Sequence, residues 1–143
     1  MQRVSKIGHR TRMAAIAVAV VAGALAWSTL AAANPAYTVS VKVVPTTVPL
    51  HALFKLTAHG NSSNTSLLKV FLNRKKDCAK TARKDASLPG DELKINTTVT
   101  GLYSKSRMLH AAHQGQHNAC AYLLALPPAH LLRARAATRY AVG

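Results

Sequence analysis

The sequence predicts an all-β domain, an antiparallel β-sandwich of about seven strands, behind an apolar N-terminal segment. Three observations favour it: apolar and polar residues alternate with a period of two, turn-forming residues recur about every ten positions, and only one short segment has helical spacing. The chain has 143 residues, so one domain of ordinary size fits behind that segment. The expected strands cover residues 37–44, 54–58, 67–72, 93–99, 103–109, 117–126 and 136–142.

The N-terminal segment, residues 1–33, has the three-part layout of a secretory signal peptide, whose apolar part we expect to be helical. Residues 1–12 are polar and basic, residues 13–30 are mostly apolar, and alanines precede Asn34 as a cleavage site. Cleavage there leaves residues 34–143 as the domain. An uncleaved membrane anchor is the alternative, because an apolar run of about 18 residues can also span a bilayer. Both interpretations place the domain outside the cytoplasm, as a secreted or extracytoplasmic protein.

Strands and a turn open the domain. Residues 37–44 alternate strictly, which is typical of a strand with one face in water. Residues 54–58 alternate in the same way and lead to Gly60. Residues 60–66, G-N-S-S-N-T-S, are all turn formers, so we expect a turn there and a third strand at residues 67–72.

One short helix is expected near Cys78. Asp77 is a residue type that caps helices, and alanines follow it at three- and four-residue spacing up to Ala86. On such a helix Cys78 points inward and the neighbouring basic residues point outward.

The remaining elements are expected to be strands. Residues 93–99 alternate into Gly101, and residues 103–109 form a more polar strand that ends before a loop. Residues 117–126 have the composition of a central buried strand, which the following prolines end. The tail at residues 136–142 alternates and is expected to close a sheet, although residues 130–136 fit a helix equally well.

Cys78 and Cys120 are the only cysteines of the chain. In an exported protein an even number of cysteines most simply forms a disulfide, so we expect a structural bond between them. The chain-entropy model gives such a bond about 4 kcal/mol of stabilisation. A redox-active pair is the alternative, but it needs close spacing such as C-x-x-C, which this chain lacks.

The chain resembles the immunoglobulin-like sandwiches in its one expected disulfide, its number of strands and the Gly-x-x-x-x-Cys run from Gly115 to Cys120. It has no tryptophan between the cysteines, and Asn118 stands where the family's corner tyrosine is expected, so neither feature is carried over. The runs G-Q-H-N-A-C-A-Y-L and C-A-K-T-A-R-K-D are similar to those of small, uncharacterised secreted bacterial proteins with this fold. That resemblance implies a fold and no activity.

We expect no enzymatic activity and no cofactor. Ser66 and Lys69 spell the S-x-x-K of penicillin-binding enzymes, but the companion S-D-N and K-T-G elements are missing. The sequence also lacks G-x-S-x-G, a phosphate-binding glycine loop and H-E-x-x-H. Its acidic residues number 4 and are not expected to converge as a catalytic pair would. They are Asp77, Asp85, Asp91 and Glu92.

His110, His113 and His117 are spaced at three and four residues, which would align them on one face of a helix as metal ligands. Gly115 interrupts such a helix, and the segment leads into the expected central strand, which would scatter the three rings. We therefore predict no metal site and keep these histidines as a less favoured alternative.

Basic residues outnumber acidic ones by 19 to 4, which gives a formal net charge of +15, so a binding partner is expected to be anionic. The plainest interpretation of the densest basic cluster is a solvated face. Its functional interpretation is attachment to an anionic cell-envelope polymer, a lipid surface or extracellular nucleic acid. No aromatic residues are interleaved with it, so sequence-specific nucleic-acid recognition is not expected. The cluster comprises Arg74, Lys75, Lys76, Lys80, Arg83 and Lys84.

The function expected from these features is that of an exported, non-enzymatic module that acts by surface contact at the cell envelope. Polyanion binding by the basic cluster is the first alternative, and metal binding by the histidines is the second. The first would appear as salt-dependent binding to anionic surfaces, and the second as ring nitrogens that converge within coordinating distance.

Overall fold

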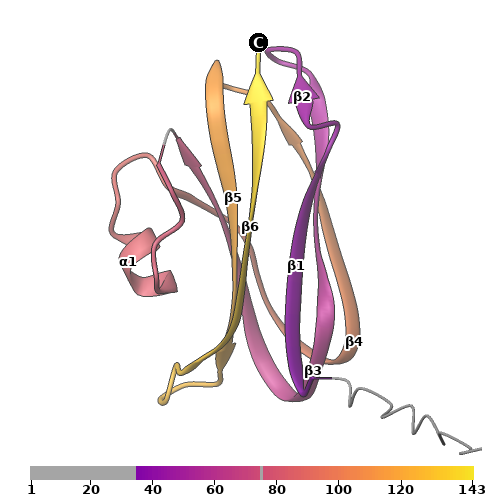
Figure 1. Cartoon of the computed structure of the whole chain (residues 1–143), viewed down its shortest axis with the longest axis vertical. Helices are drawn as coiled ribbons and strands as arrows, with labels where there is room; N and C mark the ends of the chain where they lie inside the picture. Colours follow the sequence, from indigo (N-terminus) through magenta and orange to yellow (C-terminus); the bar gives the residue numbers. More distant parts are fainter. Residues whose placement is uncertain (1–34, 75) are drawn as a thin grey trace, which may run out of the picture. The chain divides into compact units, whose positions relative to one another are not determined.

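Six strands and one short helix make up the part of the chain that the computed structural model describes, residues 35–74 and 76–143 (Figure 1). The expected signal segment, residues 1–33, and Lys75 of the basic cluster lie outside the described residues. The strands form an all-β, immunoglobulin-like sandwich, as predicted. In chain order the elements are β1 (Tyr37–Val44), β2 (Thr47–Val48), β3 (Leu53–Arg74), α1 (Ala82–Ala86), β4 (Glu92–His110), β5 (Gly115–Ala125) and β6 (Leu132–Val142).

Two layers arise because β3 and β4 are long and bend from one layer to the other. The first half of β3 pairs with β1, and its second half pairs with β5. β4 runs antiparallel to β3 along both halves. β5 pairs with β6, and the short β2 pairs in parallel with the end of β6, near the C-terminus in Figure 1. β1 therefore contacts β5 and β6 across the space between the layers.

The prediction of a turn at residues 60–66 is wrong, because β3 continues through these residues without reversing direction. The pairing with β4 is interrupted between Ser62 and Ser66, whose buried hydroxyl oxygens lie 2.6 Å apart. Both hydroxyls also contact the carbonyl oxygen of Asn64, so the turn-forming side chains bond locally within a bend. β4 likewise joins two expected strands through Gly101, whose φ of 65° suits glycine.

The interlayer core is the apolar cluster between the two layers. Leu56, Leu68 and Leu123 are 0% exposed within it, and the rings of Phe54 and Tyr140 pack with centroids 5.3 Å apart. Alternation predicts these inward positions, because residues i and i+2 of a strand share a face. The interlayer core comprises Val39, Val43, Val48, Phe54, Leu56, Ala58, Leu68, Val70, Ile95, Val99, Tyr103, Ala111, Ala119, Ala121, Leu123, Tyr140 and Val142.

The helix expected near Cys78 is present as α1, but it starts later than predicted. Its N-cap is Thr81 rather than Asp77, because Thr81 Oγ1 accepts a hydrogen bond from Lys84 N at 3.2 Å. Cys78 therefore lies in the loop before the helix, and Asp77 pairs with Arg139 instead. The described residues include no helix long and apolar enough to cross a membrane.

β5 is the central strand that the sequence predicts, and its residues 117–125 are all buried. The tail is a strand rather than a helix, since β6 pairs with β5. The register shifts between Leu123 and Leu124, which leaves Arg133 as a bulge on β6. The Arg133 guanidinium donates to Ser66 Oγ at 2.6 Å and lies 4.5 Å from the ring centroid of Tyr37.

Candidate functional site

The flap, which we define as residues 76–91, carries α1 and covers the outer face of β3 and β5 (Figure 1). A second apolar cluster lies beneath it. The cluster forms because Phe71 of β3 points away from Leu68 and Val70, which face the interlayer core. This flap cluster comprises Phe71, Ala82, Cys120, Tyr122 and Leu124, with Leu67 and Cys78 partly buried against it.

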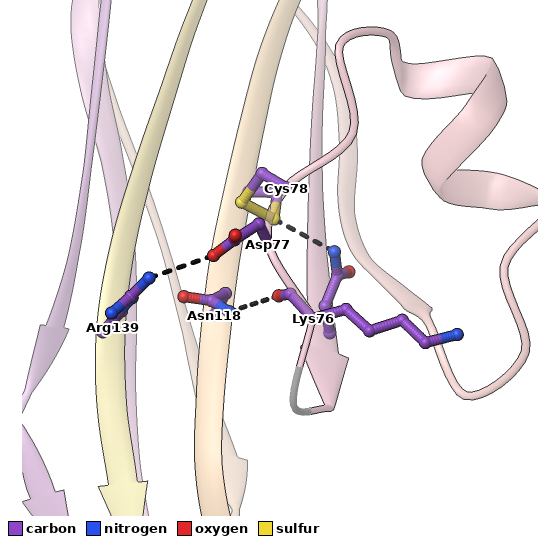
Figure 2. Close-up of polar contacts among 7 residues, drawn as sticks. Lys76, Asp77, Cys78, Asn118 and Arg139 are labelled. Atoms are coloured by element: carbon purple, nitrogen blue, oxygen red, sulfur yellow. Dashed lines mark hydrogen bonds and ion pairs between the residues drawn. A yellow bond between two sulfur atoms is a disulfide. The ribbon is translucent and has the colours of Figure 1, made fainter.

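The predicted disulfide between Cys78 and Cys120 is present, with the two Cα atoms 5.5 Å apart, and it fixes the flap to β5 (Figure 2). Cys120 is fully buried, and Asn73 Nδ2 donates a hydrogen bond to its Sγ at 3.2 Å. Beside the disulfide, Asn118 Nδ2 donates to the carbonyl oxygen of Lys76. A bond of this kind is typical of proteins that mature in an oxidising compartment.

Asp85 is the polar centre beneath the flap and is 0% exposed. Its Oδ1 accepts hydrogen bonds from Asn73 Nδ2 at 3.1 Å and from Ala79 N at 3.0 Å. The Tyr122 hydroxyl donates to Asp85 Oδ2. Burial raises the pKa of Tyr122, and the hydrogen bond and charge of Asp85 raise it further. These donors replace water around the carboxylate, so a polar network positions the flap together with the disulfide.

The flap exposes little negative charge, although it contains Asp77, Asp85 and Asp91. Both side-chain oxygens of Asp91 are buried without a hydrogen-bond partner among the described residues. Burial raises the pKa of Asp91, the charge of Asp85 raises it further, and Lys76 lowers it. Asp77 is exposed, and its Oδ1 lies 3.0 Å from Arg139 Nη2 (Figure 2). The surface of the flap is therefore basic.

A groove of about 440 Å³ lies between the flap and β6. Arg135 Nη1 donates to the carbonyl oxygen of Ala79 at 3.4 Å, which links β6 to the flap. A second hollow of about 370 Å³ shares part of this lining and adds Lys76, Gln116 and His117. The flap groove is lined by Asp77, Cys78, Asn118, Tyr122, Arg135, Ala136, Ala137, Thr138 and Arg139.

The basic cluster expected from the sequence lies largely on the flap. Lys76, Lys80, Arg83 and Lys84 are exposed there, whereas Lys75 is outside the described residues. The last member, Arg74, ends β3 and lies away from the groove, with its Nη2 3.5 Å from Glu92 Oε1. The structure therefore places four of the six predicted cations on the flap.

Two arginines of the flap groove, Arg135 and Arg139, were missed by the sequence prediction. A signal for them was present, because they alternate with Ala134 and Ala136, which pack against the interlayer core. On a strand such alternation places the arginines on the outer face. The uncertainty between strand and helix for residues 130–136 concealed Arg135, whereas Arg139 lies within the strand expected at residues 136–142.

His110, His113 and His117 line one hollow of about 270 Å³ where β4 leads into β5. His117 Nε2 lies 2.7 Å from the carbonyl oxygen of His113, and His110 Nδ1 lies 3.3 Å from that of His51. Within residues 35–74 and 76–143, no group of three His, Cys, Asp or Glu side chains is placed to hold a metal ion. These ring nitrogens face backbone oxygens instead.

The S-x-x-K arrangement does not form a reactive pair. Ser66 is buried on the face of β3 that Leu68 shares, whereas Lys69 lies on the opposite face with Phe71. Ser66 Oγ instead accepts a hydrogen bond from Arg133 Nη1 at 2.6 Å. The lysine therefore cannot activate the serine.

No protein-family model matches the sequence, and no curated protein matches it. The chain is similar to a CARDB domain from Pyrococcus furiosus, crystallised in complex with di-metal ions, with 14% identity and a TM-score of 0.47 over 74% of this chain and 86% of that one. It is also similar to the β-glucosidase from Listeria innocua in complex with glucose, with 15% identity and a TM-score of 0.40 over 73% of this chain and 16% of that one. Likenesses this distant carry no information about ligand, metal or activity.

Proposed function

We propose that the protein is an exported, non-enzymatic module that binds an anionic polymer of the cell envelope through the flap and the outer face of β6. The observation that carries this proposal is the gathering of exposed cations on the flap and along the groove beside it, where Arg135 and Arg139 line the groove and Lys76 lines the adjoining hollow. Within residues 76–91, only Asp77 exposes a carboxylate against them. The cations are Lys76, Lys80, Arg83, Lys84, Arg135 and Arg139.

Export is supported by the signal-peptide layout of residues 1–33 and by the disulfide between Cys78 and Cys120. Disulfides persist outside the cytoplasm, where thiols are not kept reduced. An exported basic surface is attracted to any anionic polymer of the envelope.

The shape of the surface suits a polymer better than an enclosed small molecule. The flap groove and the adjoining hollow share Asp77, Asn118 and Arg139, so they form one continuous depression. Arginine forks bind phosphate oxygens in pairs, and lysines add attraction at longer range. The side chains of the Arg139–Asp77 pair are 76% and 86% exposed, so this ion pair is weak and can exchange for a ligand phosphate.

Catalysis forms no part of this proposal. Of the acid–base groups at the groove, Asp77 is paired with Arg139, and the Tyr122 hydroxyl donates to Asp85, which is buried beneath the flap. Asp85 already accepts from three donors, so it is not free to take a proton from a substrate. Binding is the activity that this surface supports.

The test measures binding of the oxidised protein to poly(glycerol phosphate) over a range of salt concentrations. Replacing Lys80 and Lys84 together by glutamate should weaken binding about tenfold at low salt, because attraction becomes repulsion. The same double variant should also flatten the dependence of affinity on salt, since fewer counterions are displaced.

The matched control replaces Lys42 and Lys55 by glutamate. Both are exposed on β1 and β3 in the other layer, and the change in net charge is identical. Equal losses in the two double variants would mean that net charge, and not the flap, governs binding. Stronger binding to phosphatidylglycerol vesicles than to the polymer would replace the polymer by a lipid surface and contradict the proposal.

A further inference from the structure

The hollow at the β4–β5 end of the sandwich has an apolar interior and a charged rim. Its volume is about 270 Å³, close to the lower limit of about 300 Å³ for small-molecule pockets. Phe54, Tyr140 and Val142 of the interlayer core contribute buried apolar surface to it. The lysines of the flap and the arginines of β6 do not line it, and it shares no lining residue with the flap groove, although His117 also lines the hollow that adjoins that groove.

The aromatic wall of the hollow is rigid. The His117 ring stacks on the Tyr140 ring with centroids 5.2 Å apart and an interplanar angle of 21°. The Phe54 ring also packs against the Tyr140 ring, with centroids 5.3 Å apart. His117 is 6% exposed, and its Nε2 is fixed 2.7 Å from the carbonyl oxygen of His113. The histidine and tyrosine rings are therefore fixed in this wall, and only a small part of their surface is exposed.

The rim already holds a carboxylate between two cations. Arg74 Nη2 lies 3.5 Å from Glu92 Oε1, and Lys94 Nζ bonds Glu92 Oε2. The hydrogen bond from Lys94 is the main cause that lowers the pKa of Glu92, and the charges of Lys94 and Arg74 add to it. The charge of Glu92 also reaches the interior, because it adds to the effect of burial in raising the pKa of Tyr140.

The Glu92 side chain is 49% exposed and that of Arg74 is 41% exposed. Exposed ion pairs of this kind contribute little net stability and exchange readily. Glu92 therefore shows where a ligand carboxylate would sit, and its own carboxylate can swing into solvent to make room.

We propose that this hollow binds a small aromatic carboxylate, with its ring against His117 and Tyr140 and its carboxylate between Arg74 and Lys94. The apolar interior accepts the ring, and the two cations select an anion over a neutral or cationic analogue of the same shape. Glu92 competes with the ligand for these cations.

The experiment is an NMR titration of the oxidised protein with benzoate and with benzamide, its neutral analogue of nearly the same shape. Benzoate should shift the amide signals of Ala111, Ala112 and His113 and the ring signals of Tyr140 in a saturable way. Benzamide should bind about fivefold more weakly, because it lacks the charge that the rim recognises.

Two substitutions give opposite expected results. Glu92→Gln should tighten benzoate binding about threefold to fivefold, because it removes the competing carboxylate, and Lys94→Gln should weaken it by a similar factor. Lys42→Gln, at an exposed position of β1, is the control and should change nothing.

Three results would overturn the proposal. The first is equal binding of benzamide, or preferential binding of benzylammonium. The second is a set of shifts that lies along the flap groove instead of the hollow. The third is a Glu92→Gln variant that binds benzoate no better than the natural protein.

Discussion

The interlayer core and the flap cluster are both buried, yet different interactions stabilise them. In the interlayer core, side chains such as Leu68 and Leu123 from paired strands pack at 0% exposure. In the flap cluster, Ala82 is the one buried apolar residue that the described flap contributes. The rest of the attachment is the disulfide and the hydrogen bonds of Asp85.

The two faces of β3 show why the interlayer core and the flap cluster are stabilised by different interactions. One face meets other strands, where regular alternation supplies apolar partners at every second residue. The opposite face meets a short basic segment that has few apolar side chains to bury. A covalent bond and a polar network take the place of packing there. We therefore expect the sandwich to persist when the flap is released.

Removal of the disulfide should have the largest effect on stability. Replacing Cys78 and Cys120 by alanine should lower the free energy of unfolding by about 4 kcal/mol, because the bond links residues 42 positions apart. Urea unfolding followed by far-UV circular dichroism measures the change. A loss below about 1 kcal/mol would mean that the hydrogen bonds of Asp85 hold the flap without the bond.

Neighbouring leucines of β5 compare the two regions directly. Leu123 faces the interlayer core and Leu124 faces the flap cluster. Leu123→Ala should cost about 3 kcal/mol, because the space between paired strands cannot collapse. Leu124→Ala should cost about half as much, because the flap can move inward. Equal losses in thermal unfolding would show that the flap packs as rigidly as a sheet.

Asp85→Ala should cost about 2 kcal/mol, because it leaves Asn73 Nδ2, Ala79 N and the Tyr122 hydroxyl without their buried acceptor. Asp77→Ala is the control on the same flap and should cost less than about 0.5 kcal/mol, since its ion pair is exposed. If the two variants melted at the same temperature, the buried network would have no part in holding the flap.

Alkaline pH should weaken the interlayer core. Burial raises the pKa of Tyr103 and of Tyr140 from 10.0 to about 12. As the pH rises above 10, the unfolded chain therefore loses these protons before the folded one, and stability falls between pH 10 and pH 12. The melting temperature should drop over that range, and less so in a Tyr140→Phe variant. A flat profile would contradict this origin of the pH dependence.

Much of the sandwich could be predicted from the sequence, because alternation along a strand directly reflects which side faces the core. The bend of β3 could not, since residues such as Ser62 and Asn64 favour a reversal and a bend alike. The disulfide followed from the count of cysteines. The predicted start of α1 was wrong. Both Asp77 and Thr81 are good N-caps, and only tertiary contacts choose between them.

The candidate site was only half predictable. The lysines of the flap formed a run along the sequence, whereas Arg135 and Arg139 join them through the pairing of β6 with β5. The burial of Asp85 had no local signal, since lysine and arginine precede it in the chain. Its partners Asn73 and Tyr122 come from distant strands, and long-range contacts of this kind leave no periodic pattern.

The central claim is that the disulfide holds the flap in place and that the sandwich stays folded when the flap is released. Hydrogen exchange of the oxidised and reduced protein tests this claim most directly. After reduction, the amides of Asp85, Ser87 and Leu88 in the flap should exchange at nearly the unfolded rate. Those of β3 and β5 should remain protected by orders of magnitude. Loss of protection in both regions together, or flap amides that stay protected after reduction, would contradict the account.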